Sequence, residues 1–315
     1  MLQALTQRRW YSGIRKVALE AGIRRPILWI SRPEMASAVG RFGEILSIYH
    51  VVDEYGGYTS QDEKSRDQLW REEEALLDAV DMSIVVSNAL LQKKSGPGRD
   101  VFLVENAVDF KAYEARRESP DTPADLAAIP RPRLGYGGLI GKRLDLALLV
   151  KLAQNRPEWS LVLFGKVDSR DCRDELDALE RMDNVYFLGE KAYDTVPDYI
   201  LGLDVGLLPY RINMETRNIS PLKMYEYLAA GLPVISTRIP AVETYADVID
   251  IRECEAGFEE SCERHFSGNR MQDVEARVGV AGRNSWETRT REIWEIISNR
   301  LDSTVGADGH ARKGA

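Results

Sequence analysis

The amino-acid sequence predicts an α/β protein with two Rossmann-like domains, and three observations lead to this prediction. Short apolar segments alternate with helical segments from residue 26 onward, a pattern typical of parallel sheets. A stretch at 107–133 is poor in apolar residues, gathers several prolines, and divides the alternation into two series. The length of 315 residues also fits two domains of ordinary size.

The first series predicts strands at 26–31, 46–52, 83–87 and 101–106, with a helix over 66–81. We expect an N-terminal domain over 1–118 and a linker over 119–130.

The second series predicts strands at 133–138, 159–165, 185–189, 204–209 and 232–236, with helices between them. We expect a C-terminal, nucleotide-binding domain over 131–282, a final helix over 283–301 and a disordered tail over 302–315. In such paired domains a ligand binds in the cleft between the carboxyl ends of the two sheets.

The composition excludes several classes of function. A net charge of -8 and a pI near 5.2 argue against broad nucleic-acid binding. Three cysteines, none at the spacing of a metal-ligand pair, indicate a reducing compartment and argue against zinc. The sequence shows neither an apolar run long enough to span a bilayer nor the apolar core of a signal peptide, so we expect a cytoplasmic protein.

The first 25 residues are basic, and two interpretations of them stay open. Trp10, Ile14, Val17 and Ala21 fall on one helical face among arginines and lysines. Such a helix could lie on an anionic membrane surface, at the inner face of the cell membrane. It could equally be a solvated helix that packs on the first sheet.

One helix of the second series has the features of a phosphate and sugar site. Ser220 is a favourable N-cap, Pro221 suits the first helical position, and Gly231 suits the left-handed position after the last turn. Free N–H groups at the helix start favour a phosphate, and Lys223 adds a cation there. Glu226 shares a face with Lys223 and could accept hydrogen bonds from ribose hydroxyls. The alternative is an ordinary Lys–Glu pair on a solvated helix.

A glycine-rich loop follows the first strand of the second series. Gly137 and Gly138 would let the backbone approach a diphosphate closely, although the glycine spacing is not that of a dinucleotide fingerprint. Lys142 and Arg143 could add positive charge over a pyrophosphate, or they could be a solvated pair at a helix start.

Two acids, Asp53 and Glu54, stand where a strand of the first series ends in a glycine turn. An acidic group there could orient or deprotonate an acceptor hydroxyl. His50 lies within the strand and fits a packed histidine better than a catalyst. Asn106 and Asp109 end a strand at the domain junction, where an Asx turn explains them as well as a ligand contact does.

Five stretches of the chain resemble the bacterial GT-B glycosyltransferases of group 1, also called family 4. In order they are VDEY, VENAVDF, GYGGLIGKRLDLALL, VYFLGEKAYDTVPDYILGLDVGLLPY and RNISPLKMYEYLAAGLPVIST. The resemblance spans 26–301 and is closest to the branch found among genes for exopolysaccharide and teichuronic-acid assembly. It implies the GT-B fold with a shortened N-terminal domain, because this fold usually has more strands there than the sequence predicts. The final helix of such enzymes crosses back onto the first domain.

The resemblance implies a retaining glycosyltransferase that needs no metal or other cofactor. Its donor would be a nucleoside diphosphate sugar, with UDP or GDP as carrier, and its acceptor a cell-surface polysaccharide or a lipid-linked saccharide. Ser220 and Lys223 would bind the diphosphate and Glu226 the ribose hydroxyls, while Gly189 and Glu190 would lie near the base. Fixed cationic and dipolar groups would stabilise the leaving group.

The sequence departs from the family pattern at three places. The first of the family's paired glutamates is Asn218 here, which we expect to touch the sugar hydroxyls. The usual arginine of the glycine loop falls at Gly138, which leaves Lys142 as the expected diphosphate cation. An acid of VDEY replaces the acceptor-side histidine. The candidate catalytic residues are therefore Asp53, Glu54, Asn218 and Glu226.

Two other functions stay open at the level of the sequence. Nucleotide-sugar 2-epimerases share the two-domain architecture, but they carry several acidic and histidine residues in the cleft, which this chain supplies thinly. A non-catalytic nucleotide-sugar binder with a decayed first domain is the other alternative, prompted by the short first domain and by Asn218.

Overall fold

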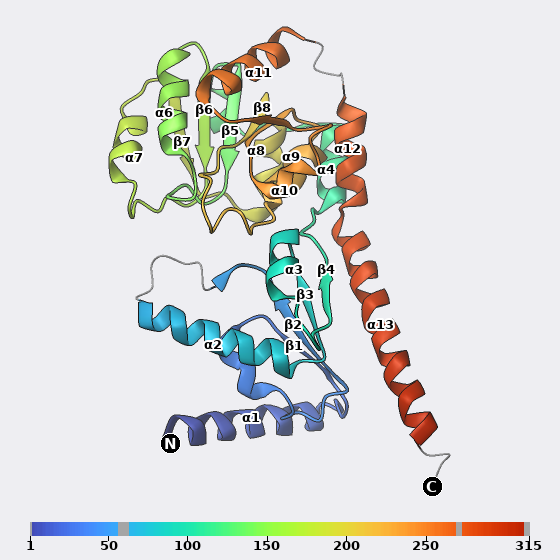
Figure 1. Ribbon diagram of the computed structural model, residues 1–315. Helices are drawn as coiled ribbons and strands as arrows, with labels where there is room; N and C mark the ends of the chain where they lie inside the picture. Colours follow the sequence, from blue (N-terminus) through green and yellow to red (C-terminus); the bar gives the residue numbers. More distant parts are fainter. Residues whose placement is uncertain (1, 56–62, 269–272, 312–315) are drawn as a thin grey trace. The chain divides into compact units, whose positions relative to one another are not determined.

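The computed structural model describes residues 2–55, 63–268 and 273–311 (Figure 1). The internal packing divides the chain into two units: unit 1 comprises 1–105 and 290–315, and unit 2 comprises 106–289. The division therefore falls ahead of the predicted linker over 119–130, which belongs to unit 2. The reason is that this stretch forms the short helix α5 (Ala124–Ala127), whose Leu126 is fully buried in the core of unit 2.

In the described part of unit 1, four parallel strands pair in the order β1-β2-β3-β4. They are β1 (Ile27–Ile30), β2 (Leu46–Val51), β3 (Met82–Val85) and β4 (Val101–Leu103). The helices are α1 (Leu2–Glu20), the 3-10 helix η1 (Pro33–Ala38), α2 (Glu63–Ala79) and α3 (Asn88–Lys94). Each strand overlaps one that the sequence predicts.

Both faces of this sheet are covered. On one face Tyr49 and Val85 pack against residues of α1, α2 and α3. On the other face Ile48 and Ile84 pack against Ile297 of the final helix, α13 (Trp286–Ala311). From Thr290 onward α13 belongs to unit 1.

Helix α13 also differs from the predicted disordered tail over 302–315. It continues to Ala311, while 312–315 lie outside the described residues. Arg300 anchors this helix to unit 1, since its Nη1 lies 2.7 Å from Asp100 Oδ2 and its Nη2 donates to Asp81 O at 3.2 Å. Once a helix is anchored, each added residue needs only its own backbone hydrogen bond, so extension is easier than initiation.

Helix α1 packs on unit 1, as one of the two interpretations of the sequence expects, and its position on a membrane surface stays a prediction. Tyr11 is buried in unit 1, and its hydroxyl lies 3.0 Å from Ser37 Oγ. The apolar residues of the predicted face stay exposed, at 54% for Trp10, 39% for Ile14 and 64% for Val17. In the part of the chain that the structure describes, α1 included, we find no helix with the length and apolar character needed to cross a membrane.

Unit 2 has a parallel sheet with the strand order β10-β9-β8-β5-β6-β7 in the described residues. Its strands are β5 (Arg133–Gly137), β6 (Ser160–Phe164), β7 (Val185–Gly189), β8 (Val205–Leu208), β9 (Val234–Thr237) and β10 (Asp250–Arg252). Counted within the unit, this is the 3-2-1-4-5-6 order of a Rossmann fold, with its switch point between β5 and β8. Ligands of such sheets bind outside the carboxyl ends of the strands at this point.

The helices of unit 2 form two groups that pack among themselves. One group comprises α6 (Leu146–Asn155), α7 (Arg173–Glu180) and α11 (Glu255–Ser267). The other comprises α4 (Phe110–Arg117), α8 (Val196–Leu201), α9 (Leu222–Ala229) and α12 (Val274–Arg283). Short helices η3 (Tyr193–Thr195) and α10 (Pro240–Glu243) complete the unit.

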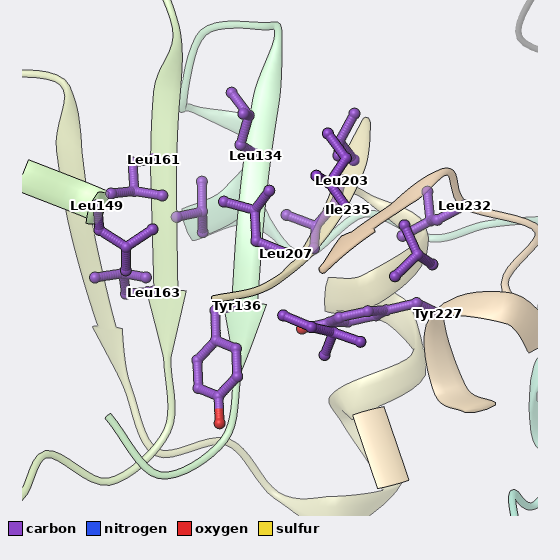
Figure 2. Packing of buried hydrophobic residues seen from close by; sticks show 14 of the residues in the cluster. Leu134, Tyr136, Leu149, Leu161, Leu163, Leu203, Leu207, Tyr227, Leu232 and Ile235 are labelled. Atoms are coloured by element: carbon purple, nitrogen blue, oxygen red, sulfur yellow. The ribbon is translucent and has the colours of Figure 1, made fainter. Parts of the chain in front are cut away.

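Tyr227 fixes α9 on the sheet beside the switch point. Figure 2 shows its ring extending from α9 toward the strands among the buried leucines of the core. Gly206 of β8 makes room for the ring, because a Cβ there would lie 2.5 Å from it. The Tyr227 hydroxyl accepts the N–H of Gly137, at the end of β5, at 3.0 Å. The position of α9 is thus set by both strands of the switch point.

Candidate functional site

Helix α9 begins one residue later than the sequence predicts. Pro221 is its N-cap and makes no side-chain capping bond, whereas Ser220 was expected to be the cap. The Ser220 hydroxyl instead accepts the backbone N–H of Asn106 at 3.3 Å, and Asn106 Nδ2 donates to Ser220 O at 2.7 Å. The Ser220 hydroxyl oxygen, which could have capped the helix, is therefore engaged by a residue far away in the sequence. At the other end the prediction is confirmed, since Gly231 has a φ of 74°.

Lys223 and Glu226 lie on one face of α9, as predicted, and form an ion pair with each other. Glu226 is only 9% exposed, so this is not the solvated surface pair of the alternative interpretation. Burial raises the pKa of Glu226 above its usual value, and the charge of Lys223 offsets only part of that shift.

Glu226 lines a pocket of about 280 Å³ that lies entirely within unit 2. The other lining residues are Asp109, Ala112, Tyr113, Arg116, Tyr193, Asp194, Val196 and Pro197, from α4, η3 and α8 and the N-cap of α4. The walls are largely apolar, with a few polar groups, as is typical of small-molecule sites.

Two arginines hold α4 in place as one wall of this pocket. Arg116 Nε lies 2.9 Å from Asp198 Oδ1, and its Nη2 donates to Asp194 O at 2.8 Å. Arg117 donates to Ala229 O at the carboxyl end of α9. Helix α4 is therefore tied to η3, α8 and α9. Asp109 caps it by accepting the N–H of Ala112 at 3.3 Å, so the structural explanation of Asp109 holds.

Sequence reasoning missed two tyrosines of this pocket. Tyr113 is 2% exposed, and its hydroxyl has no hydrogen-bond partner among the residues that the structure describes. Tyr193 is 73% exposed, so one end of the pocket carries an accessible aromatic ring. The sequence held only a faint signal for them: Tyr113 follows Asp109 by one helical turn, and Tyr193 follows the predicted base-binding Gly189 by four residues.

The glycine loop after β5 is shaped by packing. The N–H of Gly137 donates to Tyr227, and the N–H of Gly138 donates to Phe164 O at 2.9 Å. A Cβ at Gly137 would lie 2.4 Å from the Phe164 ring, and Gly138 has a φ of 152°. These glycines let β5 and β6 end close together, and their N–H groups are already engaged. A close approach of this loop to a diphosphate stays a prediction.

The cations of this loop have different environments. Arg143 is paired, with its Nε 2.5 Å from Glu215 Oε1, so it is not the solvated residue of the alternative interpretation. Lys142 is half-buried and stays the predicted diphosphate cation.

Asn218 lies in the loop before α9 and is 6% exposed. Its Nδ2 donates to Met214 O at 2.5 Å, so the amide nitrogen closes a turn within the loop. Its predicted contact with sugar hydroxyls is not tested by this geometry.

Gly189 and Glu190 lie at the end of β7 and are exposed. Gly189 has a φ of 68°, and its carbonyl accepts the N–H of Gly165 at 2.8 Å. Their place beside a base stays a prediction.

In unit 1 the two predicted acids differ sharply. Glu54 is 3% exposed and accepts from Lys93 at 2.7 Å and from Lys94 at 3.1 Å. Lys94 also lies 2.8 Å from Glu73, which accepts the Tyr49 hydroxyl at 2.9 Å. Glu54 therefore belongs to a buried ionic network, which gives it a structural role, and its predicted action on an acceptor stays a prediction.

Asp53 is half-buried and accepts the N–H of Glu54 at 2.9 Å, and it stays the candidate acid on the acceptor side. The glycine turn that follows, at 56–62, lies outside the described residues. His50 packs against the ring of Trp29 at 5.4 Å, and burial lowers its pKa, which fits the predicted packed histidine. Across the described ranges, the acidic, histidine and cysteine side chains form no group of three or more that could hold a metal ion.

Solved structures resemble the chain along most of its length. A crystal structure of Anabaena Alr3699/HepE with UDP and glucose has a TM-score of 0.69 at 14% identity, covering 91% of this chain and 80% of that one. The alpha,alpha-trehalose 6-phosphate synthase of Burkholderia multivorans has a TM-score of 0.68 at 13% identity, covering 98% and 76%. The chain has the GT-B fold. At these identities the likeness concerns the fold alone.

A family model matches part of unit 2 of this GT-B chain. Residues 142–258, which include α9, match the model of the family described as glycosyl transferases group 1. A Bacillus subtilis (strain 168) protein named "Putative teichuronic acid biosynthesis glycosyltransferase TuaH" is 28% identical over 222 residues, covering 69% of this chain and 55% of that protein. The chain therefore spans little more than half the length of this relative.

Proposed function

We propose that this GT-B protein is a glycosyltransferase that moves a sugar from a nucleoside diphosphate to an acceptor. One observation carries the proposal: half-buried Lys223 and buried Glu226 form an ion pair on one face of α9, beside the switch point of a sheet with the Rossmann strand order. That helix lies within the residues that match the glycosyl transferase family model. The same matches favour sugar transfer over the epimerase and over a non-catalytic binder.

The proposed donor site assigns one part of the nucleotide sugar to each group. Lys223 and the start of α9, with Lys142, bind the diphosphate, where fixed positive charge stabilises the leaving group. Glu226 accepts hydrogen bonds from the two ribose hydroxyls. Asn218 contacts the sugar, and Gly189 with Glu190 borders the base. Asp53 acts on the acceptor hydroxyl.

We further propose that transfer retains the anomeric configuration and needs no metal. The acceptor would be a cell-surface polysaccharide or a lipid-linked saccharide; the Bacillus relative is named for teichuronic acid biosynthesis, which supports the first of these. The exposed apolar face of α1, with basic residues beside it, would let the protein work at an anionic membrane surface on the cytoplasmic side.

A donor panel tests the proposal. The protein is incubated with UDP-sugars and GDP-sugars, with and without a lipid extract of bacterial membranes, and nucleoside diphosphate release is measured. We expect acceptor-dependent release from one donor that persists with EDTA, and a product whose anomeric configuration, read by NMR, matches the donor. Conversion of a nucleotide sugar to its C2 epimer with no acceptor present would instead identify an epimerase. Nucleotide binding without any turnover would identify a binding protein.

A further inference from the structure

Three loops at the carboxyl ends of the unit 2 strands are bonded to one another. They follow β5, β6 and β8 and comprise residues 138–144, 165–172 and 209–221. The N–H of Ile140, in the loop after β5, donates to Lys166 O, in the loop after β6, at 2.8 Å. The N–H of Arg211, in the loop after β8, donates to Arg143 O, in the loop after β5, at 2.9 Å. The three loops therefore form one connected surface.

This surface presents large apolar side chains to solvent. Leu139, Val167, Ile212 and Met214 are between 41% and 67% exposed, and we call these four residues the apolar rim. They come from all three loops. Exposed large apolar side chains that gather on one part of a surface mark interaction sites, whereas single ones need no explanation.

The exposure of Ile212 and Met214 does not come from a loosely held loop. Between them, Asn213 Oδ1 accepts the N–H groups of Glu215 and Thr216 at 2.9 Å and 3.0 Å. The Glu215 carboxylate is in turn paired with the loop after β5. The polar groups of this segment are thus engaged within the protein, and its two large apolar side chains are left in solvent.

The same three loops are basic, although the protein is acidic. They contain six basic and three acidic residues, whereas the net charge of the whole chain is -8. One of the acids, Asp168, is paired with Arg170. Lys166, next to Val167 in the sequence, and Arg217, in the loop of Met214, are both exposed. A ligand that complements this surface must combine an apolar part with negative charge.

A bilayer of anionic lipid and a single lipid phosphate both have this chemistry, and the position of the rim favours the single molecule. The loop after β5 contains Lys142 and the loop after β8 leads into α9, so the rim borders the proposed diphosphate site. A bilayer spread over the rim would cover that site, whereas one lipid molecule would bring its head group to it.

We propose that the apolar rim binds the hydrocarbon chain of an acceptor in which a saccharide is linked to a lipid phosphate, with Lys166 and Arg217 binding the phosphate. This inference rests on the proposed function and selects the lipid-linked saccharide from the two acceptors proposed there.

A soluble analogue of such a lipid tests the apolar contacts. Calorimetry with farnesyl phosphate, below its critical micelle concentration, measures the Kd of the wild type and of the double variant Ile212→Ser, Met214→Ser. We expect the variant to raise this Kd about 10- to 50-fold, because two apolar side chains no longer contact the chain. The melting temperature and the Kd for UDP should stay those of the wild type, since both side chains are exposed and lie outside the proposed donor contacts.

The basic residues are tested with and without the phosphate. The double variant Lys166→Gln, Arg217→Gln should raise the Kd for farnesyl phosphate about 5- to 30-fold, the scale of hydrogen bonds to a charged group. Binding of farnesol, which has the same chain and no phosphate, should be weaker in the wild type and unaffected by this variant.

Ile23→Ser is the matched control for the rim. Ile23 is 51% exposed, close to the 49% of Ile212, and two arginines follow it in the sequence, but it belongs to unit 1. This variant should bind farnesyl phosphate like the wild type. An equal loss for Ile23→Ser and for the rim variant would show unspecific binding of the chain and overturn the inference.

Two further results would overturn it. The first is a wild type that binds UDP but not farnesyl phosphate, which would reject the lipid site and leave the proposed function standing. The second is a rim variant with weaker binding to phosphatidylglycerol vesicles and an unchanged Kd for farnesyl phosphate, which would make the rim a membrane contact. Conversely, rim-dependent binding of farnesyl phosphate by a protein that binds no nucleotide would support the lipid site and reject the proposed function.

Discussion

On α9, the ammonium group of Lys223 and the carboxylate of Glu226 form an ion pair with each other, three residues apart and largely shielded from water. Shielding such a pair from water has a free-energy cost, because both charges lose hydration and their mutual attraction offsets only part of that loss. In the proposed donor complex each partner gains a ligand group: the diphosphate for Lys223 and the ribose for Glu226. The pair keeps both charges compensated until the donor arrives.

Removal of the Glu226 carboxylate should weaken donor binding. Glu226→Ala is expected to reduce the affinity for the donor nucleotide by roughly 1.5–3 kcal/mol, the scale of hydrogen bonds to a charged group. Calorimetric titration with the nucleoside diphosphate measures it. Glu243→Ala, which removes an exposed glutamate paired with Arg238, is the control and should have no effect. Unchanged affinity of Glu226→Ala for every nucleotide sugar tried would show that Glu226 does not touch the ribose.

The two partners of the pair should respond to different parts of the ligand. Lys223→Met is expected to weaken UDP binding by about 1.5–3 kcal/mol, because a charge-assisted contact to phosphate is lost. Uridine, which has no phosphate, should lose much less affinity. Glu226→Ala should weaken both ligands equally. If Lys223→Met weakens uridine as much as UDP, the lysine supports the fold of the site and does not bind the diphosphate.

The raised pKa of Glu226 predicts an acid-sensitive donor site. Only the ionised carboxylate accepts from both ribose hydroxyls, so affinity should fall as the pH drops through this pKa, beginning above the usual range of a glutamate. The effect on stability has the opposite sign. A pKa raised by folding means that Glu226 favours the folded state below its unfolded pKa, and this contribution is lost as the pH rises through the folded value.

Calorimetry across pH measures this dependence, and Glu226→Gln provides the comparison. The variant has no titratable group at this position. Its affinity for the nucleotide should therefore be lower than that of the wild type, and it should lack the part of the pH dependence that arises from Glu226. Titration of the diphosphate itself is common to both proteins and cancels in the comparison. Parallel pH profiles for the two proteins would count against a titrating Glu226 at the ribose.

Local sequence signals located helix α9 but not all of its contacts. Gly231 marked the helix end because a left-handed residue there is a local requirement, and the Lys223–Glu226 spacing set their shared face. Ser220 was assigned as a cap because nothing local shows that Asn106, 114 residues away in sequence, would take its oxygen. Tyr113 escaped notice for the same reason: its environment is made by η3, α8 and α9 together.

The strand pattern predicted the parallel sheets for similar local reasons, since each buried strand is a short apolar run. It missed β10, which has the polar composition Asp-Ile-Arg and is held by pairing with β9. Glu54 shows how little the sequence reveals about the surroundings of a charged residue. An acid after a strand suggested chemistry, and only the fold shows that two lysines of α3 enclose it.

The buried network around Glu54 predicts unequal roles for two adjacent lysines. Burial alone would lower the pKa of Lys94, but Glu73 and Glu54 raise it, so its charge compensates two buried carboxylates. Lys94→Met should therefore lower the free energy of unfolding by about 3–5 kcal/mol. Lys93→Met is the control: its side chain is 44% exposed, and the expected loss is at most about 1 kcal/mol. Urea unfolding measures both, and equal losses would contradict the network.

The exposed stripe of α1 predicts binding to anionic membranes. Trp10, Ile14 and Val17 would enter the lipid interface while Arg9 and Lys16, both exposed, contact anionic head groups. Neutralising both basic residues to glutamine should weaken binding to phosphatidylglycerol vesicles about 30-fold, from about 1 kcal/mol for each charge. Sedimentation with vesicles measures it, and neutral phosphatidylcholine vesicles should bind weakly in every case.

Trp10→Ala tests the apolar contribution of α1 to vesicle binding in the same experiment. Trp294→Ala on α13 is its control. Trp294 is 61% exposed, close to the 54% of Trp10, but it lies on a different helix. Only Trp10→Ala should reduce vesicle binding, because lipid insertion requires an aromatic side chain within a basic stripe. Equal effects of the two substitutions would mean that any exposed tryptophan suffices, and α1 would then be only a solvated helix packed through Tyr11.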